Sequence, residues 1–162
     1  MSAHSSMVNF SSRYHQHTFI AALIAAIAAT ISAYFSMTPW VMFIGWVAYF
    51  TNPGTIKGTI SSALCTCLGV LLGIIAASCV KLLIVKAGVM AFAIVVFFVA
   101  IFVVSMRGLR WVGNIVAWFL GLITYFAIHT QPTPYSVTLV VLTIILGSIS
   151  GYIAHQLQQY FN

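Results

Sequence analysis

Acidic residues are absent from this chain, and charge of any kind is scarce. The 162 residues include no Asp or Glu against six Lys and Arg, and only 4% are charged. Cation sites and proton relays in membranes rely on carboxylates, as do carboxyl general acids and bases and the Ser-His-Asp triad. The composition therefore argues against a carboxylate-driven pump, against carboxylate coordination of hard cations and against an enzyme of these classes.

Cysteine and histidine also lack the spacing that is typical of a tight metal site. The three cysteines lie in one apolar segment: Cys65, Cys67 and Cys79. On a helix Cys65 and Cys67 would point about 200° apart, so they cannot share a ligand on one face. We expect buried, reduced thiols. His4, His15 and His17 have no tight metal spacing with the cysteines and indicate a weak surface site at most. No metal and no cofactor are expected.

Apolar residues make up what remains. They account for 62% of the chain, and the mean hydropathy is +1.12. These values predict an integral membrane protein, because soluble domains use about 25% charged residues. We expect a polar N-terminal segment over 1–17, a single transmembrane helical domain over 18–157 and a short tail over 158–162. The six positive charges are spread in ones and twos, which indicates membrane topology and no nucleic-acid partner.

Six apolar segments are predicted in the membrane domain. They cover residues 18–34, 39–50, 55–80, 87–105, 111–128 and 135–155. The first is expected to be a retained span, because another membrane segment follows it directly. The second has some 12 residues, about 18 Å of helix, which is less than the roughly 30 Å of hydrocarbon. It must be tilted, re-entrant or extended by the loop that follows.

The two halves of the chain show a similar order of residues. Tyr49-Phe50 followed by Gly69 and Gly73 corresponds to Tyr125-Phe126 followed by Gly147 and Gly151. An odd number of spans in each half would invert the second, so the fold class predicted is all-α, a polytopic membrane helical bundle of about six transmembrane segments built from two inverted three-helix repeats. The glycine pairs are expected to pack closely against another helix or subunit, which favours a homo-oligomer.

The basic residues predict the orientation in the membrane. If all six segments span, four basic residues lie on one side of the membrane and two on the other. The four are Arg13, Lys57, Arg107 and Arg110, and the two are Lys81 and Lys86. This bias places the amino terminus in the cytoplasm. The assignment would reverse after the second segment if that segment were re-entrant.

The break after the second segment is the first candidate for a solute pathway. Asn52-Pro53-Gly54 cannot continue a regular helix, and irregular backbone at membrane depth is tolerated only where protein or a water-filled cavity covers it. A plain interfacial turn is the alternative. Lys57 follows the break and would attract an anion at the mouth of a pathway, or would serve as a snorkelling anchor.

A second group of candidates surrounds the start of the fifth segment. Arg107 and Arg110 would lie on one helical face if the helix begins early, as a forked pair of donors for a carboxylate or phosphate, or they would anchor the cytoplasmic interface. Asn114 and Asn52 carry amides that need partners near hydrocarbon. They would line a polar path or bond to a broken helix end.

The break also carries a family resemblance. The stretch Tyr49-Phe50-Thr51-Asn52-Pro53-Gly54-x-x-Lys57-Gly58, with the Trp/Gly-rich helix before it, resembles the small inner-membrane proteins of domain-of-unknown-function family 1097 over most of the chain. More distantly, the order of elements is similar to the membrane half of the fusaric acid resistance and aromatic acid exporter superfamily, which implies an anion exporter or channel. That superfamily commonly has an arginine before the glycine pair, where this chain has Leu64-Cys65-Thr66-Cys67-Leu68.

Together these features predict a small transport protein of the bacterial inner (plasma) membrane. It would work as a homo-oligomer in the lipid bilayer, channel-like or exporter-like, for a small organic anion or neutral polar solute. The alternative is a non-transporting membrane scaffold or accessory subunit of a larger complex, in which the polar residues only anchor the bundle. We do not expect an enzyme.

Overall fold

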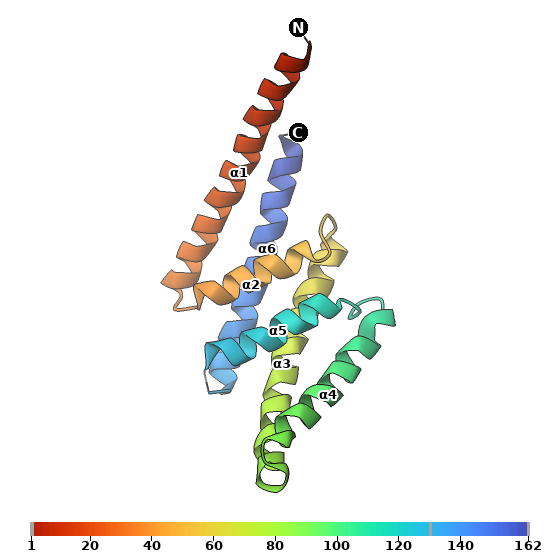
Figure 1. Cartoon of the computed structure of the whole chain (residues 1–162). Coiled ribbons are helices and arrows are strands. Elements are labelled where there is room, and N and C mark those ends of the chain that lie inside the picture. Colours follow the sequence, from red (N-terminus) through yellow and green to blue (C-terminus); the bar gives the residue numbers. More distant parts are fainter. Residues whose placement is uncertain (1, 130, 162) are drawn as a thin grey trace.

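Helices make up nearly all of the structure. The computed structural model describes residues 2–129 and 131–161, with side chains from residue 14 onward, so Met1, Thr130, Asn162 and the side chains of His4 and Arg13 lie outside it. That part of the chain contains no strand (Figure 1). Its elements are α1 (Ser2–Tyr34), α2 (Pro39–Phe50), α3 (Ile56–Ala87), α4 (Met90–Ser105), the 3-10 turn η1 (Met106–Gly108), α5 (Ile115–Ile128) and α6 (Pro134–Tyr160).

Among the described residues, four segments are long and apolar enough to cross a membrane. They are Tyr14–Tyr34, Ile56–Ala87, Met90–Gly108 and Pro134–Tyr160, while α2 and α5 are shorter apolar helices. Helix α4 exposes the aromatic residues Phe92, Phe97 and Phe98. The all-helical fold and the membrane class predicted from composition are confirmed.

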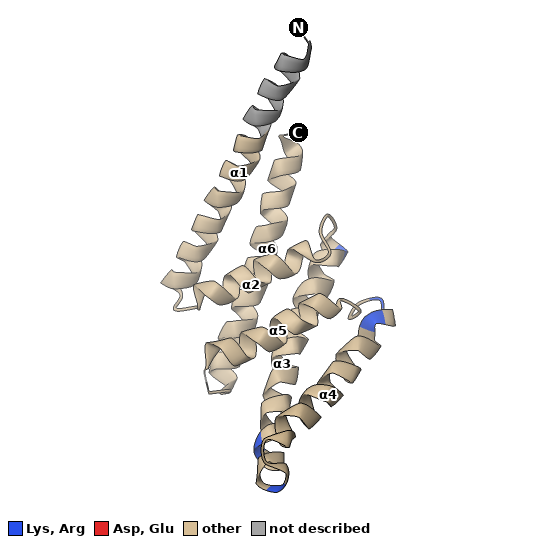
Figure 2. Ribbon diagram, in the orientation of Figure 1, with Lys and Arg blue, Asp and Glu red and all other residues tan. Residues whose placement is uncertain are grey.

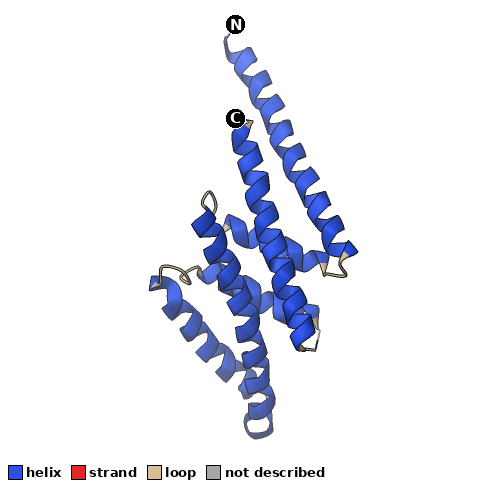
Figure 3. Ribbon diagram, turned by 180° about the vertical axis from the view of Figure 1, so that it is seen from behind, coloured by secondary structure: helices blue, strands red, loops and turns tan. Residues whose placement is uncertain are grey.

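Each of the two short helices crosses a long helix of the other half of the chain. In Figure 1, α2 crosses α6 and α5 crosses α3, and the view from behind in Figure 3 places α3 and α6 on the opposite face. These two pairs form the most extensive packing in the molecule. Helix α1 lies against α6 and α2, and α4 lies against α3. The centre of the protein is therefore built from contacts between its two halves.

Glycines make the crossing of α2 and α6 close. A Cβ atom on Gly45 would overlap the carbonyl oxygen of Ile144, and one on Gly147 would overlap the carbonyl oxygen of Met42. Each helix thus offers a glycine to the backbone of the other. Small residues allow this approach in lipid, where dispersion contacts and weak polar contacts hold helices together.

The crossing of α3 and α5 has the same construction. A Cβ atom on Gly69 would overlap the carbonyl oxygen of Trp118, and one on Gly121 would overlap that of Thr66. The second glycine of each predicted pair meets a tyrosine ring of the short helix. A Cβ atom on Gly73 would lie 2.9 Å from the Tyr125 ring, and one on Gly151 would lie 3.1 Å from the Tyr49 ring.

The predicted helix limits require correction around the fifth segment. Helix α5 begins at Ile115, not at Trp111, so Asn114 is its N-cap rather than a residue one turn inside. The Trp118 indole donates to the carbonyl oxygen of Val112 at 2.8 Å, and Ser61 Oγ donates to that of Trp111 at 2.8 Å. These bonds use the carbonyl groups that an earlier start of the helix would need.

The long helices also extend beyond their predicted ends. Helix α1 begins at Ser2 and includes the segment expected to precede the first span. Helix α3 continues through Lys81 and Lys86 to Ala87, so both lysines lie on a helix and not in a connection. Helix α6 continues to Tyr160, which places much of the predicted tail in the helix.

Candidate functional site

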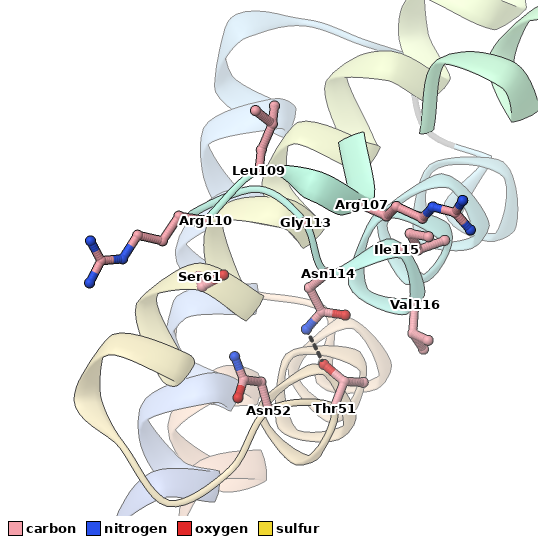
Figure 4. A pocket seen from close by; sticks show the side chains of 10 residues that line it. All are labelled: Thr51, Asn52, Ser61, Arg107, Leu109, Arg110, Gly113, Asn114, Ile115 and Val116. Carbon is pink, nitrogen blue, oxygen red and sulfur yellow. Dashed lines mark hydrogen bonds between the residues drawn. The ribbon is translucent and has the colours of Figure 1, made fainter. Parts of the chain in front are cut away.

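The two irregular connections at one end of the short helices border an open polar pocket. The α2–α3 connection meets the segment between η1 and α5, and the pocket between them has a volume of about 380 Å³ (Figure 4). It is lined by Thr51, Asn52, Ser61, Arg107, Leu109, Arg110, Gly113, Asn114, Ile115 and Val116. Four of the seven candidate pathway residues, which come from two separate stretches of sequence, therefore line one pocket.

Asn114 is the best-anchored polar group of this pocket. Its Nδ2 donates to Thr51 Oγ1 at 2.5 Å and to Ser62 Oγ at 3.0 Å, and its Oδ1 accepts from the backbone nitrogen of Ala117 at 3.2 Å. The side chain thus caps α5 and ties it to the end of α2 and to α3. The sequence left two roles open for this amide, a bond to a broken helix end and a place in a polar path. The bond to the helix end is present, and the amide also lines the pocket.

Two arginines flank the pocket without forming the forked pair that the sequence suggested. Arg107 belongs to the 3-10 turn and Arg110 to the irregular segment after it, so no single helical face carries both. Figure 4 shows their guanidinium groups pointing away from each other on either side of the pocket. Both side chains are exposed. They can supply positive potential to the pocket mouth, while a bidentate grip by both on one anion would need their side chains to move.

The Asn52-Pro53-Gly54 break forms a tight, polar turn beside the pocket. Asn52 lines the pocket, and its backbone nitrogen donates to the carbonyl oxygen of Tyr49 at 3.2 Å. Gly54 has φ of 93°, a conformation that favours glycine. Pro53 and Gly54 are exposed and lie outside the pocket lining. A side chain on Gly58 would overlap the carbonyl oxygen of Asn52, so the turn folds closely onto α3.

Lys57 lies near the site but does not line the pocket. Its ammonium group is 5.1 Å from the centroid of the Trp111 ring, a cation–π contact that joins the start of α3 to the segment before α5. Figure 2 shows the Lys and Arg residues of the described part of the chain in two places, with the start of α3 and the region of η1 on one side and the far end of α3 on the other. Lys57, Arg107 and Arg110 thus give the pocket side a positive potential.

A buried tyrosine and a partly buried histidine beside the break could not be identified from the sequence. Tyr49 is fully buried, and its hydroxyl group is hydrogen-bonded to Nδ1 of His155 and accepts from the backbone nitrogen of Gly54 at 3.1 Å. Nε2 of His155 lies 3.2 Å from Gln159 Nε2. These bonds join α6 to the turn. Tyr49 stood in the family motif, but nothing in the sequence paired it with a residue so far along the chain.

The thiols and histidines form no metal centre in the described part of the chain. No group of three His, Cys, Asp or Glu is close enough to hold a metal ion there. The cysteines are free, with Cys65 buried and Cys67 and Cys79 partly buried. His15 is exposed, whereas Nε2 of His17 is buried without a hydrogen-bond partner. His129 ends α5 in a left-handed conformation and is exposed.

The pocket offers donors and positive charge, and none of its residues carries negative charge. Its donors are amides, hydroxyls and guanidinium groups. It has no negative charge because the chain has no carboxylate side chain. Leu109, Ile115 and Val116 add an apolar wall. Such a site can attract and hold a small anion or a neutral polar solute.

Comparisons with known proteins place the chain in a family. No curated protein and no solved structure matches it. The family model described as "Protein of unknown function (DUF1097)" matches residues 19–159, which is nearly the whole chain. The match includes every residue of the pocket and of both glycine crossings. The chain therefore belongs to the DUF1097 family of proteins of unknown function.

Proposed function

We propose that this protein is a membrane transport protein, channel-like or exporter-like, whose solute is a small anion or a neutral polar molecule. The observation that supports it best is the convergence of Asn52, Arg107, Arg110 and Asn114 on one pocket at the ends of two short membrane helices. Arginines at the mouth would concentrate anions and repel cations, and the fixed amides would replace part of the solute's hydration.

The pathway would lie between two inverted three-helix units. The crossings of α2 with α6 and of α5 with α3 use glycines at matching positions, as expected if α1–α3 and α4–α6 are related by a two-fold axis in the membrane plane. In this arrangement α2 and α5 are short spans, and the long helices are tilted around them. The resemblance to the exporter superfamily leads to the same proposal.

Assembly and orientation complete the proposal. Exposed apolar faces on α1 and α4 would contact lipid or another copy of the chain. We expect a homo-oligomer, because a single bundle of this size has little room to enclose a selective path. The pocket side, with Lys57, Arg107 and Arg110, would face the cytoplasm of a bacterium, and Lys81 and Lys86 would lie on the other side of the inner membrane. Reporter fusions after Lys86 and after Tyr160 would then show opposite locations, and equal locations would overturn this orientation.

The function is tested by flux through proteoliposomes. Purified protein is compared for uptake of small organic anions, chloride and urea, with the double variant Arg107→Gln/Arg110→Gln. We expect anion flux to fall about two- to five-fold per arginine, the loss typical of one exposed charge interaction, with urea flux little changed. Lys81→Gln/Lys86→Gln removes the same charge at the far end of α3 and should leave anion flux near the wild-type value.

The outcomes separate the two functions. An equal loss in both double variants would mean a general effect of net charge and would remove the arginines from the pathway. Absence of flux for every solute in wild-type vesicles would reject the transport proposal. It would favour the scaffold or accessory subunit, whose partner would then be sought by co-purification from membranes.

A further inference from the structure

A second pocket lies at the opposite ends of the same two short helices. Helix α2 runs from Pro39 to Phe50 and α5 runs from Ile115 to Ile128, so the polar pocket adjoins the end of α2 and the start of α5. The second pocket has a volume of about 310 Å³ and adjoins the start of α2 and the end of α5. It is lined by Ser36, Met37, Thr38, Ile128, Tyr135, Ser136, Leu139, Val140 and Thr143.

The linings of the two pockets occupy matching positions in the two halves. Asn114 follows Thr38 by the same number of residues as Gly121 follows Gly45. Thr38 is the N-cap of α2 and Asn114 is the N-cap of α5. Thr38 lines the second pocket and Asn114 the first.

Further pairs follow the same rule. Ile128 follows Asn52 by the same number of residues as Asn114 follows Thr38. In the same way, Leu139 follows Ser61 by the same number of residues as Gly147 follows Gly69. Asn52 and Ser61 line the first pocket, and Ile128 and Leu139 line the second. Even the helix caps correspond, since Thr55 accepts from Gly58 N as Thr133 accepts from Ser136 N.

The chemistry of the two pockets differs although their positions match. The amides Asn52 and Asn114 are replaced by Ile128 and Thr38, and no Lys or Arg among the described residues lines the second pocket. Its polar groups are the hydroxyls of Ser36, Thr38, Tyr135, Ser136 and Thr143, beside an apolar wall. A bare inorganic anion would lose hydration there without gaining a cation, whereas hydroxyls can bond to an uncharged polar group.

A buried apolar cluster lies beneath the second pocket. Val140 lines the pocket and packs with Val41, Val70 and Ile144, all of which are less than a tenth exposed. On the other side, Asn114 reaches inward to Ser62, and Thr66 Oγ1 donates to the Ser62 carbonyl oxygen at 2.8 Å. A solute path from the first pocket toward the second would therefore begin beside hydroxyl groups and meet four aliphatic side chains before the second pocket. Such an apolar constriction can gate by excluding water.

We infer that the pocket lined by Thr38, Ser136, Leu139 and Thr143 is the second mouth of the solute path, and that it holds the solute through hydroxyl groups and apolar contact without a charge. This inference rests on the proposed transport function and narrows its solute to a small organic anion with uncharged polar and apolar surface. Such a solute is held more tightly at the cationic pocket than at the hydroxyl pocket.

Single cysteines test the position and the charge of this mouth. In a variant with Cys65, Cys67 and Cys79 replaced by Ala, Asn52→Cys reports on the first pocket and Thr38→Cys on the second. Anionic and cationic methanethiosulfonate reagents are added to one side of sealed vesicles or to the other. Asn52→Cys should react from one side and several-fold faster with the anionic reagent. Thr38→Cys should react from the opposite side, at similar rates with both reagents.

Controls keep the result readable. Val89→Cys, at an exposed site in the α3–α4 connection, marks the side that Thr38→Cys should share. Ser36→Cys replaces Thr38→Cys if that variant does not fold. Reaction of both pocket positions from the same side, no reaction at the second pocket from either side, or a strong anionic preference there would overturn the inference.

Flux separates the failure of this inference from the failure of the proposed function. Modification of Thr38→Cys should slow uptake of the organic anion in proteoliposomes by several-fold. If the unmodified protein carries the anion and modification changes nothing, the second mouth is wrong while transport stands. If the wild-type protein carries no solute, transport is rejected, and the second mouth with it.

Discussion

The Asn114 amide nitrogen lies 2.5 Å from Thr51 Oγ1 and so joins two connections that are far apart in sequence. The same amide donates to Ser62 Oγ and its oxygen caps α5. Thr51 Oγ1 in turn donates to the carbonyl oxygen of Ala48 at 2.6 Å. The polar pocket is therefore built on a bonded frame that links α2, α3 and α5.

Substitutions of Asn114 should separate this structural role from a role in the pathway. Asn114→Ala removes the cap and the donor, and loss of the cap alone costs about 1 kcal/mol of unfolding free energy. Asn114→Asp keeps a capping oxygen, but it loses the donor and puts negative charge in the pocket. We expect Asn114→Ala to lower the unfolding temperature more, and Asn114→Asp to lower anion flux more. The reverse order in both measurements would contradict the assignment of this side chain to the pocket.

Removal of the Tyr49 hydroxyl should loosen the turn after α2. Tyr49→Phe removes the hydrogen bonds to the Gly54 backbone nitrogen and to His155 Nδ1, and loss of one such partly buried bond costs about 0.5–1.5 kcal/mol. Faster proteolysis at Asn52–Gly54 and a lower unfolding temperature are expected. Tyr135→Phe, at an exposed site, is the matched control and should change neither. Equal behaviour of the two variants would mean that the hydroxyl does not hold the turn.

Most features that could be predicted from the sequence, such as the helices and the break after α2, depend on local patterns of residues. Apolar runs predicted the order and number of the helices, and Asn52-Pro53-Gly54 predicted the break, because these signals depend on neighbouring residues alone. The pocket could be predicted in its parts, Asn52, Arg107, Arg110 and Asn114, but not as one site.

What could not be predicted depends on contacts between distant parts of the chain. The Tyr49–His155 bond joins residues with no shared local pattern. The late start of α5 follows from bonds of Ser61 and Trp118 to backbone carbonyl groups, which a pattern of apolar residues cannot reveal. The opposed directions of the two arginines follow from that late start.

A methyl group at the centre of a helix crossing should destabilise the bundle. In Gly147→Ala the new Cβ would overlap the carbonyl oxygen of Met42, a backbone atom that cannot move alone, so the helices must separate. We expect a loss of about 1–3 kcal/mol, as for overpacking of a core, read as a lower unfolding temperature in detergent.

The control for this substitution uses a glycine in open space. A Cβ on Gly108 would meet nothing within 4 Å, so Gly108→Ala should leave the unfolding temperature unchanged. Gly69→Ala should repeat the effect of Gly147→Ala, because its Cβ would overlap the Trp118 carbonyl oxygen in the matching crossing. A large effect at only one of these two glycines would argue against two equivalent crossings.

The contact between Lys57 and Trp111 should appear as an energetic coupling. The ammonium group lies over the indole ring at an exposed position, where a cation–π contact contributes about 0.5–1 kcal/mol. A double-mutant cycle with Lys57→Met and Trp111→Leu, followed by thermal unfolding, measures this coupling directly. Lys57→Arg should keep most of this coupling energy, since a guanidinium also stacks on an indole.

If the coupling is present and anion flux in Lys57→Met is normal, the lysine joins α3 to the segment before α5 and takes no part in the pathway. If flux falls several-fold in Lys57→Met but not in Trp111→Leu, its charge acts on the solute.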